Sequence, residues 1–322
     1  MFSIGAHTSI AGGIQNSIPR SHSIGADALQ IFAKSPRGWF YSNDKITDDI
    51  VQKCQQSFSE TNHKYGMIHS VYLINLAKAP KDAAKDVDSV IDDFKIADRI
   101  GFSSVNVHLG KYSDMTKQQT FQNMAENLAK ILEATKDYDV DFLFENTSGQ
   151  GTEVGYRFDE LAEFYDFLKK FFGQEYVEQK VKFCFDTAHG WGAGYDLNDF
   201  GQVMDEFDKF LGKDNLYCFH LNDSKAICGS RLDRHASLGR GFVGLNALFQ
   251  VVDWAYDNNK PIILETPDPD LRSEEIQMIR KYISGEFSGK EILDFNNKYF
   301  MTEYLKKFEK YITNQYERGF FG

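Results

Sequence analysis

The sequence predicts a single α/β domain, a (β/α)8 TIM barrel with a C-terminal helical extension. Short apolar runs recur along the chain, and stretches with helical periodicity, such as residues 83–101 and 115–137, lie between most of them. Six of the runs end in a histidine or a carboxylate: His69, His108, Glu145, Asp186, His220 and Glu265. Successive members of this set are 34 to 45 residues apart, which fits one strand, one loop and one helix in each unit. Continuous apolar strands of this kind are typical of a parallel sheet that is covered on both faces.

Eight apolar runs are the expected strands. In chain order they are FSIGAH (2–7), ALQIFA (28–33), YGMIH (65–69), SVNVH (104–108), DFLFE (141–145), VKFCFD (181–186), LYCFH (216–220) and PIILE (261–265). Gly101 follows the first helical stretch, as expected of a helix C-cap before the next strand. The alternative is an open, doubly wound sheet, but its ligands would gather at one switch point rather than at six strand ends.

The chain is expected to divide into a barrel domain, residues 1–284, and an extension, residues 285–322. Within the extension an apolar residue recurs every four positions, at Phe300, Tyr304, Phe308 and Ile312. This stripe predicts an amphipathic helix packed on the outside of the barrel. A contact with a second copy of the chain, or with DNA, is the alternative use of the same stripe.

Composition limits the class of protein. Of the 322 residues, 42% are hydrophobic, and no apolar run approaches the roughly 20 residues of a membrane span. The N-terminus does not resemble a signal peptide, and the four cysteines show no CxxC spacing, so we expect reduced thiols and a cytoplasmic, intracellular protein. The net charge of −11 argues against a polyanionic partner at face value, but bound divalent cations would offset much of it.

Histidines and carboxylates together suggest a metal centre. Five of the eight histidines fall in the pattern, and His7, His22 and His63 lie outside it. The candidate ligands are His69, His108, Glu145, Asp186, His189, His220, Asp233, His235 and Glu265. Burying so many unpaired polar groups on one barrel rim would be costly, and metal ions remove that cost. With no cysteine among them, these residues indicate an open, hydrolytic centre of several ions rather than a closed structural zinc site.

Phosphodiester hydrolysis suits such a centre. Metal binding lowers the pKa of water from 15.7 to about 7, which supplies a hydroxide nucleophile, and a further ion stabilises the leaving alkoxide. The sequence has no convincing nucleophilic triad, and its glycine-rich pieces lack the spacing of a P-loop or a dinucleotide fingerprint.

Six blocks of sequence resemble endonuclease IV, the zinc-dependent apurinic/apyrimidinic endonuclease family. They are IGAHTSIAGG (4–13), HSVYLINLA (69–77), ENTSGQG (145–151), DTAHGWGAGYD (186–196), HLNDSKAICGSRLDRHASLGRG (220–241) and ILETPDPD (263–270). The blocks beginning at Asp186 and His220 are the most specific, and together the six span the barrel from residue 1 to about 284.

The resemblance implies three Zn²⁺ ions, with Mn²⁺ as a substitute. His69, His108 and Glu145 would hold the first ion. Glu145 would bridge to a second, which is completed by Asp186, His220 and Glu265. His189, Asp233 and His235 would hold the third. Glu145 and Glu265 are the expected catalytic carboxylates.

The implied substrate is double-stranded DNA, cleaved by a monomer. The family cuts 5′ to an abasic site, leaving a 3′-hydroxyl and a 5′-deoxyribose phosphate, and it also removes blocked 3′ ends. Extruding a nucleotide that lacks its base costs less energy than extruding an intact one. The expected DNA contacts are Lys34 to a phosphate, Arg37 as the residue entering the duplex, Tyr72 and Arg234.

Four positions depart from the family pattern. Ser70 and Val71 stand where Asp-Ser is frequent, and Leu109 and Lys111 flank Gly110 where Pro-Gly-Ser is usual. The ligands are intact, so these changes affect the expectations about DNA contacts and lesion preference.

Two other functions are compatible with parts of the pattern. A sugar isomerase or epimerase on a related barrel would use one or two divalent ions, and it would have no use for His189, Asp233 and His235. A protein that binds DNA damage without cleaving it would keep the loops but lose catalysis, and nothing in the ligand set suggests such a loss.

Overall fold

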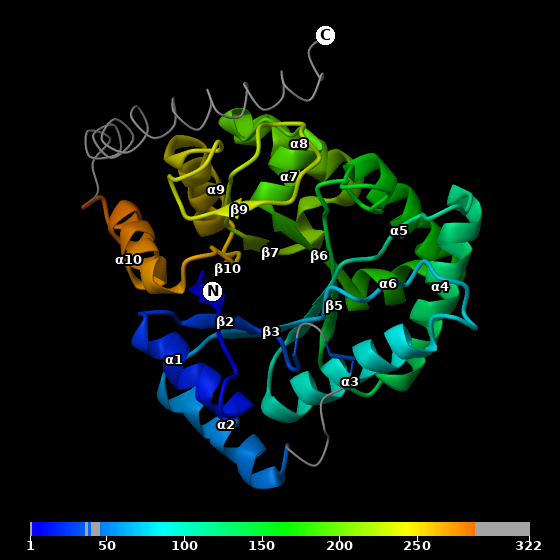
Figure 1. The fold of residues 1–322 in the computed structure, drawn as a ribbon, viewed down its shortest axis with the longest axis horizontal. Helices are drawn as coiled ribbons and strands as arrows, with labels where there is room; N and C mark the ends of the chain where they lie inside the picture. The colour runs from blue at the N-terminus through cyan, green and yellow to red at the C-terminus, as the bar shows by residue number, and fades with distance from the viewer. Residues whose placement is uncertain (1, 36–37, 40–45, 287–322) are drawn as a thin grey trace, which may run out of the picture.

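Eight parallel strands close into a barrel surrounded by helices in the computed structural model, which describes residues 2–35, 38–39 and 46–286 (Figure 1). The barrel strands are β1 (Ile4–His7), β2 (Ala28–Ile31), β3 (Tyr65–His69), β4 (Ser104–Val107), β5 (Asp141–Glu145), β6 (Val181–Asp186), β7 (Leu216–His220) and β10 (Ile262–Leu264). Going round the barrel, the order is β1-β10-β7-β6-β5-β4-β3-β2. The predicted barrel is confirmed, and closure of the sheet rules out the open, doubly wound alternative.

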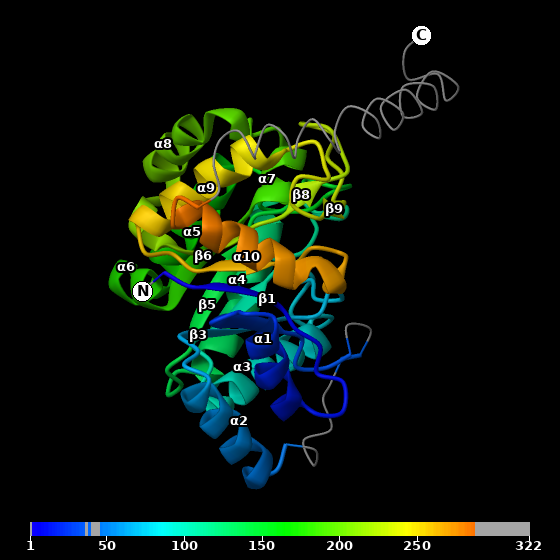
Figure 2. The same ribbon diagram turned by 90° about the vertical axis from the view of Figure 1, so that its left-hand side faces the viewer.

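A short antiparallel pair lies outside the barrel, formed by β8 (Asp223–Ser224) and β9 (His235–Ala236). In Figure 2 this pair lies on one side of the barrel, and the N-terminus lies on the opposite side. The pair follows β7, so it belongs to the rim at the C-terminal ends of the strands.

The described helices lie between successive barrel strands, except α10, which follows β10. They are α1 (Ser17–Ser23), α2 (Asp48–Glu60), α3 (Ala84–Ile100), α4 (Lys117–Ala134), α5 (Phe158–Phe172), α6 (Gln174–Lys180), α7 (Thr187–Ala193), α8 (Phe200–Leu211), α9 (Leu245–Asp257) and α10 (Arg272–Ile283). Single 3-10 turns occur at Ile14–Asn16, Leu197–Asp199, Lys213–Asn215 and Pro269–Leu271. None of the described helices is both long enough and apolar enough to cross a membrane.

Local sequence fixes where the helices begin and end. The side chain of Thr116 accepts a hydrogen bond from Gln119 N at the start of α4, and Thr47 does the same for Ile50 N at the start of α2. Helix α3 ends at Gly101, which has a φ of 82°, a left-handed conformation that glycine adopts without strain. Gly101 is therefore the C-cap that the sequence predicts.

Side chains alternate between the barrel interior and the layer beneath the helices. In β5, Phe142 packs against Phe94 of α3 and Phe144 stacks on Phe164 of α5, whereas Leu143 points into the barrel. The buried residues that fill the lower interior are Ala28, Tyr65, Met67, Leu143, Cys184, Cys218 and Ile263. In β3, β5, β6 and β7 the last residue of the strand lies two positions after one of these buried residues and is polar: His69, Glu145, Asp186 and His220. This alternation brings the polar residues of the strands to one rim, above a plug of apolar and thiol side chains.

The predicted C-terminal extension begins where the described residues end. Helix α10 ends at Ile283, and the stripe from Phe300 to Ile312 lies outside the described residues. The division between residues 284 and 285 therefore stays a prediction. Cys54, Cys184, Cys218 and Cys228 are all free, as expected of reduced thiols.

His63, outside the ligand pattern, is a buried core residue that predicts a pH-dependent stability. Its Nε2 bonds Ser21 Oγ at 2.9 Å and its Nδ1 bonds Thr61 Oγ1 at 2.7 Å, and burial lowers its pKa from 6.5 to about 4. As the pH falls, His63 therefore gains a proton in the unfolded chain before it does so in the folded protein. The contribution of neutral His63 to the free energy of unfolding is complete above pH 6.5 and is lost progressively down to pH 4. Between pH 7 and 5 the loss is about 2 kcal/mol.

Urea unfolding of the wild type and of His63→Gln at pH 7 and pH 5 measures this loss. The variant, which cannot titrate, is expected to lose about 2 kcal/mol less between the two pH values. Equal losses for the two proteins would show that His63 is not responsible.

Candidate metal centre

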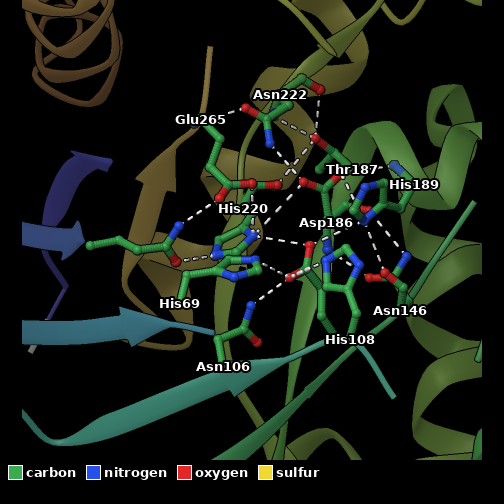
Figure 3. A network of polar contacts seen from close by, with 12 residues as sticks. His69, Asn106, His108, Asn146, Asp186, Thr187, His189, His220, Asn222 and Glu265 are labelled. Carbon is green, nitrogen blue, oxygen red and sulfur yellow. Dashed lines mark hydrogen bonds and ion pairs between the residues drawn. The ribbon is translucent and has the colours of Figure 1, made fainter. Parts of the chain in front are cut away.

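Glu145, the last residue of β5, lies at the middle of the polar rim and is fully buried. One carboxylate oxygen, Oε2, lies 3.1 Å from His69 Nε2 and 3.1 Å from His108 Nε2. The other, Oε1, lies 3.1 Å from His189 Nδ1 and 3.2 Å from His220 Nδ1. The two oxygens therefore face different pairs of imidazoles, and these four histidines surround one small space (Figure 3).

Three groups of residues bring potential ligand atoms within 4.8 Å of one another. They are His69, His108 and Glu145; Glu145, Asp186, His220 and Glu265; and Asp186, His189 and His235. Glu145 belongs to the first and second groups, and Asp186 belongs to the second and third. The first two groups have the same members as the sets implied by the family resemblance. Neighbouring groups therefore share a carboxylate, as expected if the ions of one centre lie close together.

Asp233, the third ligand implied for the last group, is more exposed than the other members. Its Oδ2 lies 3.4 Å from His189 Nε2, and its Oδ1 lies 3.3 Å from His235 Nε2. Both Asp233 and His235 come from the segment around β9, outside the barrel strands. A loop therefore completes the third group. The carboxylate of Asp186 lies on the buried side of this group, and that of Asp233 lies on the exposed side.

Hydrogen bonds to main-chain carbonyl groups orient two of the histidines. A carbonyl oxygen can only accept, so His69 Nδ1 donates to Ser70 O at 2.6 Å and His189 Nδ1 donates to Asn146 O at 2.9 Å. Each of these two imidazoles presents its Nε2 to a carboxylate, Glu145 for His69 and Asp233 for His189, where a metal ion could bind. Such outer partners usually orient metal-binding histidines.

Gln30, which the sequence analysis did not single out, orients a third histidine. Its amide Nε2 donates to Glu265 Oε1 at 2.5 Å, so its Oε1 faces His220 and accepts from Nε2 at 2.8 Å. The opposite nitrogen, His220 Nδ1, lies 3.1 Å from Glu265 Oε2. Gln30 thus holds an imidazole and a carboxylate of the same group in one arrangement.

The donor set fits divalent metal ions. Imidazole nitrogens and carboxylate oxygens are the ligands of catalytic zinc sites. His235 Nε2 is buried and has no hydrogen-bond partner among the described residues, although it lies 3.6 Å from Asp186 Oδ2 and 3.3 Å from Asp233 Oδ1. A metal ion would satisfy this nitrogen together with both carboxylates.

The charges in the centre are strongly coupled. Burial alone would raise the pKa of Glu145, but His108 and His220 outweigh it and hold the pKa well below its usual range. Burial likewise disfavours the imidazolium forms, yet the pKa of His220 lies well above its usual value because of Glu265 and Glu145, and that of His189 because of Asp186 and Asp233. Metal ions would displace protons from these imidazoles, so metal binding is coupled to proton release.

Two asparagines and a histidine complete the surroundings. Asn106 Nδ2 donates to Glu145 Oε2 at 2.5 Å, and Asn222 Nδ2 donates to Asp186 Oδ2 at 2.7 Å. His7, which lies outside the sequence pattern, contacts Gln30 at 2.9 Å, and burial lowers its pKa to about 3, so it is neutral. Strand alternation could have indicated Gln30 and Asn106, because each lies two positions after an inward-facing residue of its strand.

The predicted DNA contacts have different positions. Tyr72 is 64% exposed beside the centre, and its ring lies 5.8 Å from that of His69. Arg234 is exposed, and Arg37 lies outside the described residues. The side chain of Lys34, in contrast, is 1% exposed and its Nζ lies 2.8 Å from Asp93 Oδ1. A buried ammonium paired in this way does not face solvent, so the geometry speaks against the phosphate contact predicted for Lys34.

The four departures from the family pattern lie beside the centre and not among its ligand atoms. Ser70 supplies the carbonyl that accepts from His69, and Val71 is buried. Leu109 is fully buried, and Lys111 N donates to Asn75 Oδ1 at 3.1 Å.

The fold and the site together define a class of protein. The model of the xylose isomerase-like TIM barrel family matches residues 18–282. The solved structure of a D-tagatose 3-epimerase-like protein has a TM-score of 0.64 at 15% identity, covering 89% of this chain and 100% of that one. At this identity the likeness concerns the fold alone.

Closer relatives narrow the class. A protein of Haloquadratum walsbyi named "Probable endonuclease 4" is 37% identical over 272 residues, which are 82% of this chain and 92% of that protein. The crystal structure of endonuclease IV from Thermus thermophilus has a TM-score of 0.76 at 30% identity and covers 88% of this chain and 99% of that one. The chain belongs to the endonuclease IV family.

Gln30→Met tests whether the outer contacts organise the centre. Methionine has a similar size but cannot orient His220 or Glu265, so the affinity for Zn²⁺ should fall by about 10- to 100-fold. Competition with a chromophoric chelator measures that affinity. Gln56→Met on the exposed face of α2 is the matched control and should bind Zn²⁺ as the wild type does. Unchanged affinity in Gln30→Met would mean that Gln30 only fills space.

Proposed function

We propose that this chain is a DNA-repair endonuclease that hydrolyses the phosphodiester 5′ to abasic sites in double-stranded DNA, using three Zn²⁺ ions. The products would carry a 3′-hydroxyl and a 5′-deoxyribose phosphate. The observation that carries the proposal is the set of three overlapping ligand groups, joined by Glu145 and Asp186, in a chain of the endonuclease IV family. Action inside the cell as a monomer, removal of blocked 3′ ends and tolerance of Mn²⁺ belong to the same proposal.

His69, His108 and Glu145 would hold one ion; Glu145, Asp186, His220 and Glu265 a second; and His189, His235 and Asp233, beside Asp186, a third. When bound, the ions would lower the pKa of water and offset the negative charge that develops on the phosphodiester. Glu145 and Glu265 are the proposed catalytic carboxylates, because each is held ionised by adjacent imidazoles.

Residues around the centre would position the DNA. Tyr72 presents an exposed ring 6.3 Å from that of His108, where it can contact a nucleotide next to the cleaved bond. Its ring also packs edge-on against Phe32 at 5.3 Å, a contact that does not depend on DNA. Arg234, on the segment that carries Asp233 and His235, is exposed on the same rim.

The third ligand group distinguishes this proposal from a sugar isomerase. One or two divalent ions are enough for isomerisation, and the first two groups could supply them. The arrangement of His189, His235 and Asp233 around a further site is difficult to explain in such an enzyme. A phosphodiesterase gains from it, because another cation can offset charge on the leaving oxygen.

Cleavage of a duplex that contains one tetrahydrofuran abasic mimic tests the function. With metal content measured on the same sample, the expected result is about three metal ions per chain and a single nick 5′ to the mimic. An undamaged duplex of the same sequence is the substrate control. Three ions without a nick would contradict the proposed activity, and one ion without a nick would favour the isomerase.

Glu145→Gln should remove most cleavage, by about 100-fold or more, because a neutral amide is a poor bridge between two cations. Binding of the abasic duplex should partly survive, since the rim loops remain. Steady-state cleavage and fluorescence anisotropy measure the two effects. Full turnover in this variant would refute the bridging role of Glu145.

Tyr72→Ala should weaken binding of the abasic duplex by about tenfold without changing the metal content, because an exposed aromatic ring is lost from the rim. Tyr256→Ala is the matched control, since Tyr256 is 50% exposed on α9 and contacts Phe2 near the opposite end of the barrel. The same effect is predicted for Arg37→Ala. Wild-type affinity in either rim variant would remove that residue from the interface.

A further inference from the structure

Lys34 follows β2 but directs its ammonium group into the protein. Nζ lies 2.8 Å from Asp93 Oδ1 and donates to Ser89 O at 2.7 Å. Asp93 and Ser89 both belong to α3, and both are fully buried. Because a buried charge is stable only when it is paired, this contact holds the chain after β2 firmly against α3.

Asp93 extends the contact toward the metal centre. Its second oxygen, Oδ2, accepts a hydrogen bond from Ser70 Oγ at 2.8 Å. Ser70 follows His69, and its carbonyl oxygen accepts from His69 Nδ1 at 2.6 Å. A continuous series of polar contacts therefore runs from Lys34 through Asp93 and Ser70 to a metal-facing imidazole.

A second lysine pairs with the same face of α3. Asp86 lies seven residues before Asp93, two helical turns away, and is 1% exposed. Each of its carboxylate oxygens lies 2.9 Å from Lys78 Nζ, and Oδ1 also accepts from Asn75 N at 2.7 Å. Lys78 Nζ also lies 5.5 Å from the centre of the Trp39 ring. The Lys78–Asp86 pair therefore holds the chain after β3 against α3, and Lys78 also contacts the chain after β2.

We infer that α3 couples two segments of the rim through the contacts Lys34–Asp93–Ser70 and Lys78–Asp86. The β2 segment is residues 32–35 with Trp39, and the β3 segment is residues 70–78. The segments also touch directly through Phe32 and Tyr72, whose rings lie 5.3 Å apart. Lys34 is then a positioning residue that acts through Asp93 and Ser70, not a phosphate ligand. The coupling stands without a substrate, whereas its effect on DNA rests on the proposed function.

Hydrogen–deuterium exchange tests the coupling without DNA. Lys34→Met keeps the length of the side chain but leaves Asp93 without its cation, so amide exchange should become about tenfold faster in both segments. Exchange in residues 223–236, elsewhere on the rim, should not change. Lys53→Met is the matched control, because Lys53 pairs with Asp49 on the exposed surface of α2. Faster exchange in the β2 segment alone would overturn the coupling.

Two further variants separate coupling from general loss of stability. In Lys34→Met/Asp93→Asn the amide oxygen can still accept from Ser70, so exchange in the β3 segment should return toward the wild-type rate while residues 32–35 stay fast. Ser70→Ala keeps the Lys34–Asp93 ion pair and removes only the hydrogen bond from Ser70 to Asp93. This variant is therefore informative even if Lys34→Met does not fold. Wild-type exchange at residues 70–78 in Ser70→Ala would also overturn the coupling.

The salt dependence of DNA binding separates the two roles of Lys34. A phosphate contact contributes about one to the slope of log affinity against log salt concentration. If Lys34 is a positioning residue, Lys34→Met should lower the affinity for the tetrahydrofuran duplex by about tenfold and leave the slope unchanged. A slope reduced by about one would overturn the positioning role. If the wild type binds no abasic DNA, the proposed function fails and the exchange experiment still decides the coupling.

Discussion

The placement of one buried carboxylate, Glu145, determines how the rest of the site is built. An ionised carboxylate without contact to solvent needs cations or donors around both oxygens. Glu145 has four imidazoles within 3.2 Å and the amide of Asn106. These groups come from β3, β7, α7 and the strand end of β4, so the barrel must close with its strands in the observed register for the carboxylate to be satisfied. Metal ions between Glu145 and the imidazoles would meet the same requirement and add catalytic chemistry.

Much of the fold and of the site could be predicted because strand alternation has a period of two. His69, Glu145, Asp186 and His220 each end an apolar run, and each side chain points into the barrel two positions after a residue of the buried plug. The same rule applies to Gln30, which follows Ala28 of the plug and was nevertheless overlooked. A neutral amide inside an apolar run does not suggest a metal centre until its neighbours in space are known.

Contacts between distant segments were beyond sequence reasoning. Lys34 lies 59 residues before its partner Asp93, and a lysine in a polar stretch near Arg37 is typical of a solvated loop. Only the packing of α3 against the barrel shows that its ammonium group is buried. The role of Asp186 in two ligand groups depends likewise on the position of β9, which no periodicity in the segment around Asp233 indicates.

The proposed centre requires that one carboxylate, Glu145, joins two metal sites and that Asp186 lies beside a third. Anomalous diffraction at the zinc absorption edge, from crystals of zinc-loaded protein, tests it most directly. We expect three separate peaks, one in each ligand group, with Glu145 contacting two of them and His189 and His235 contacting the third. A single peak, or peaks that leave Glu145 without a metal contact, would contradict it.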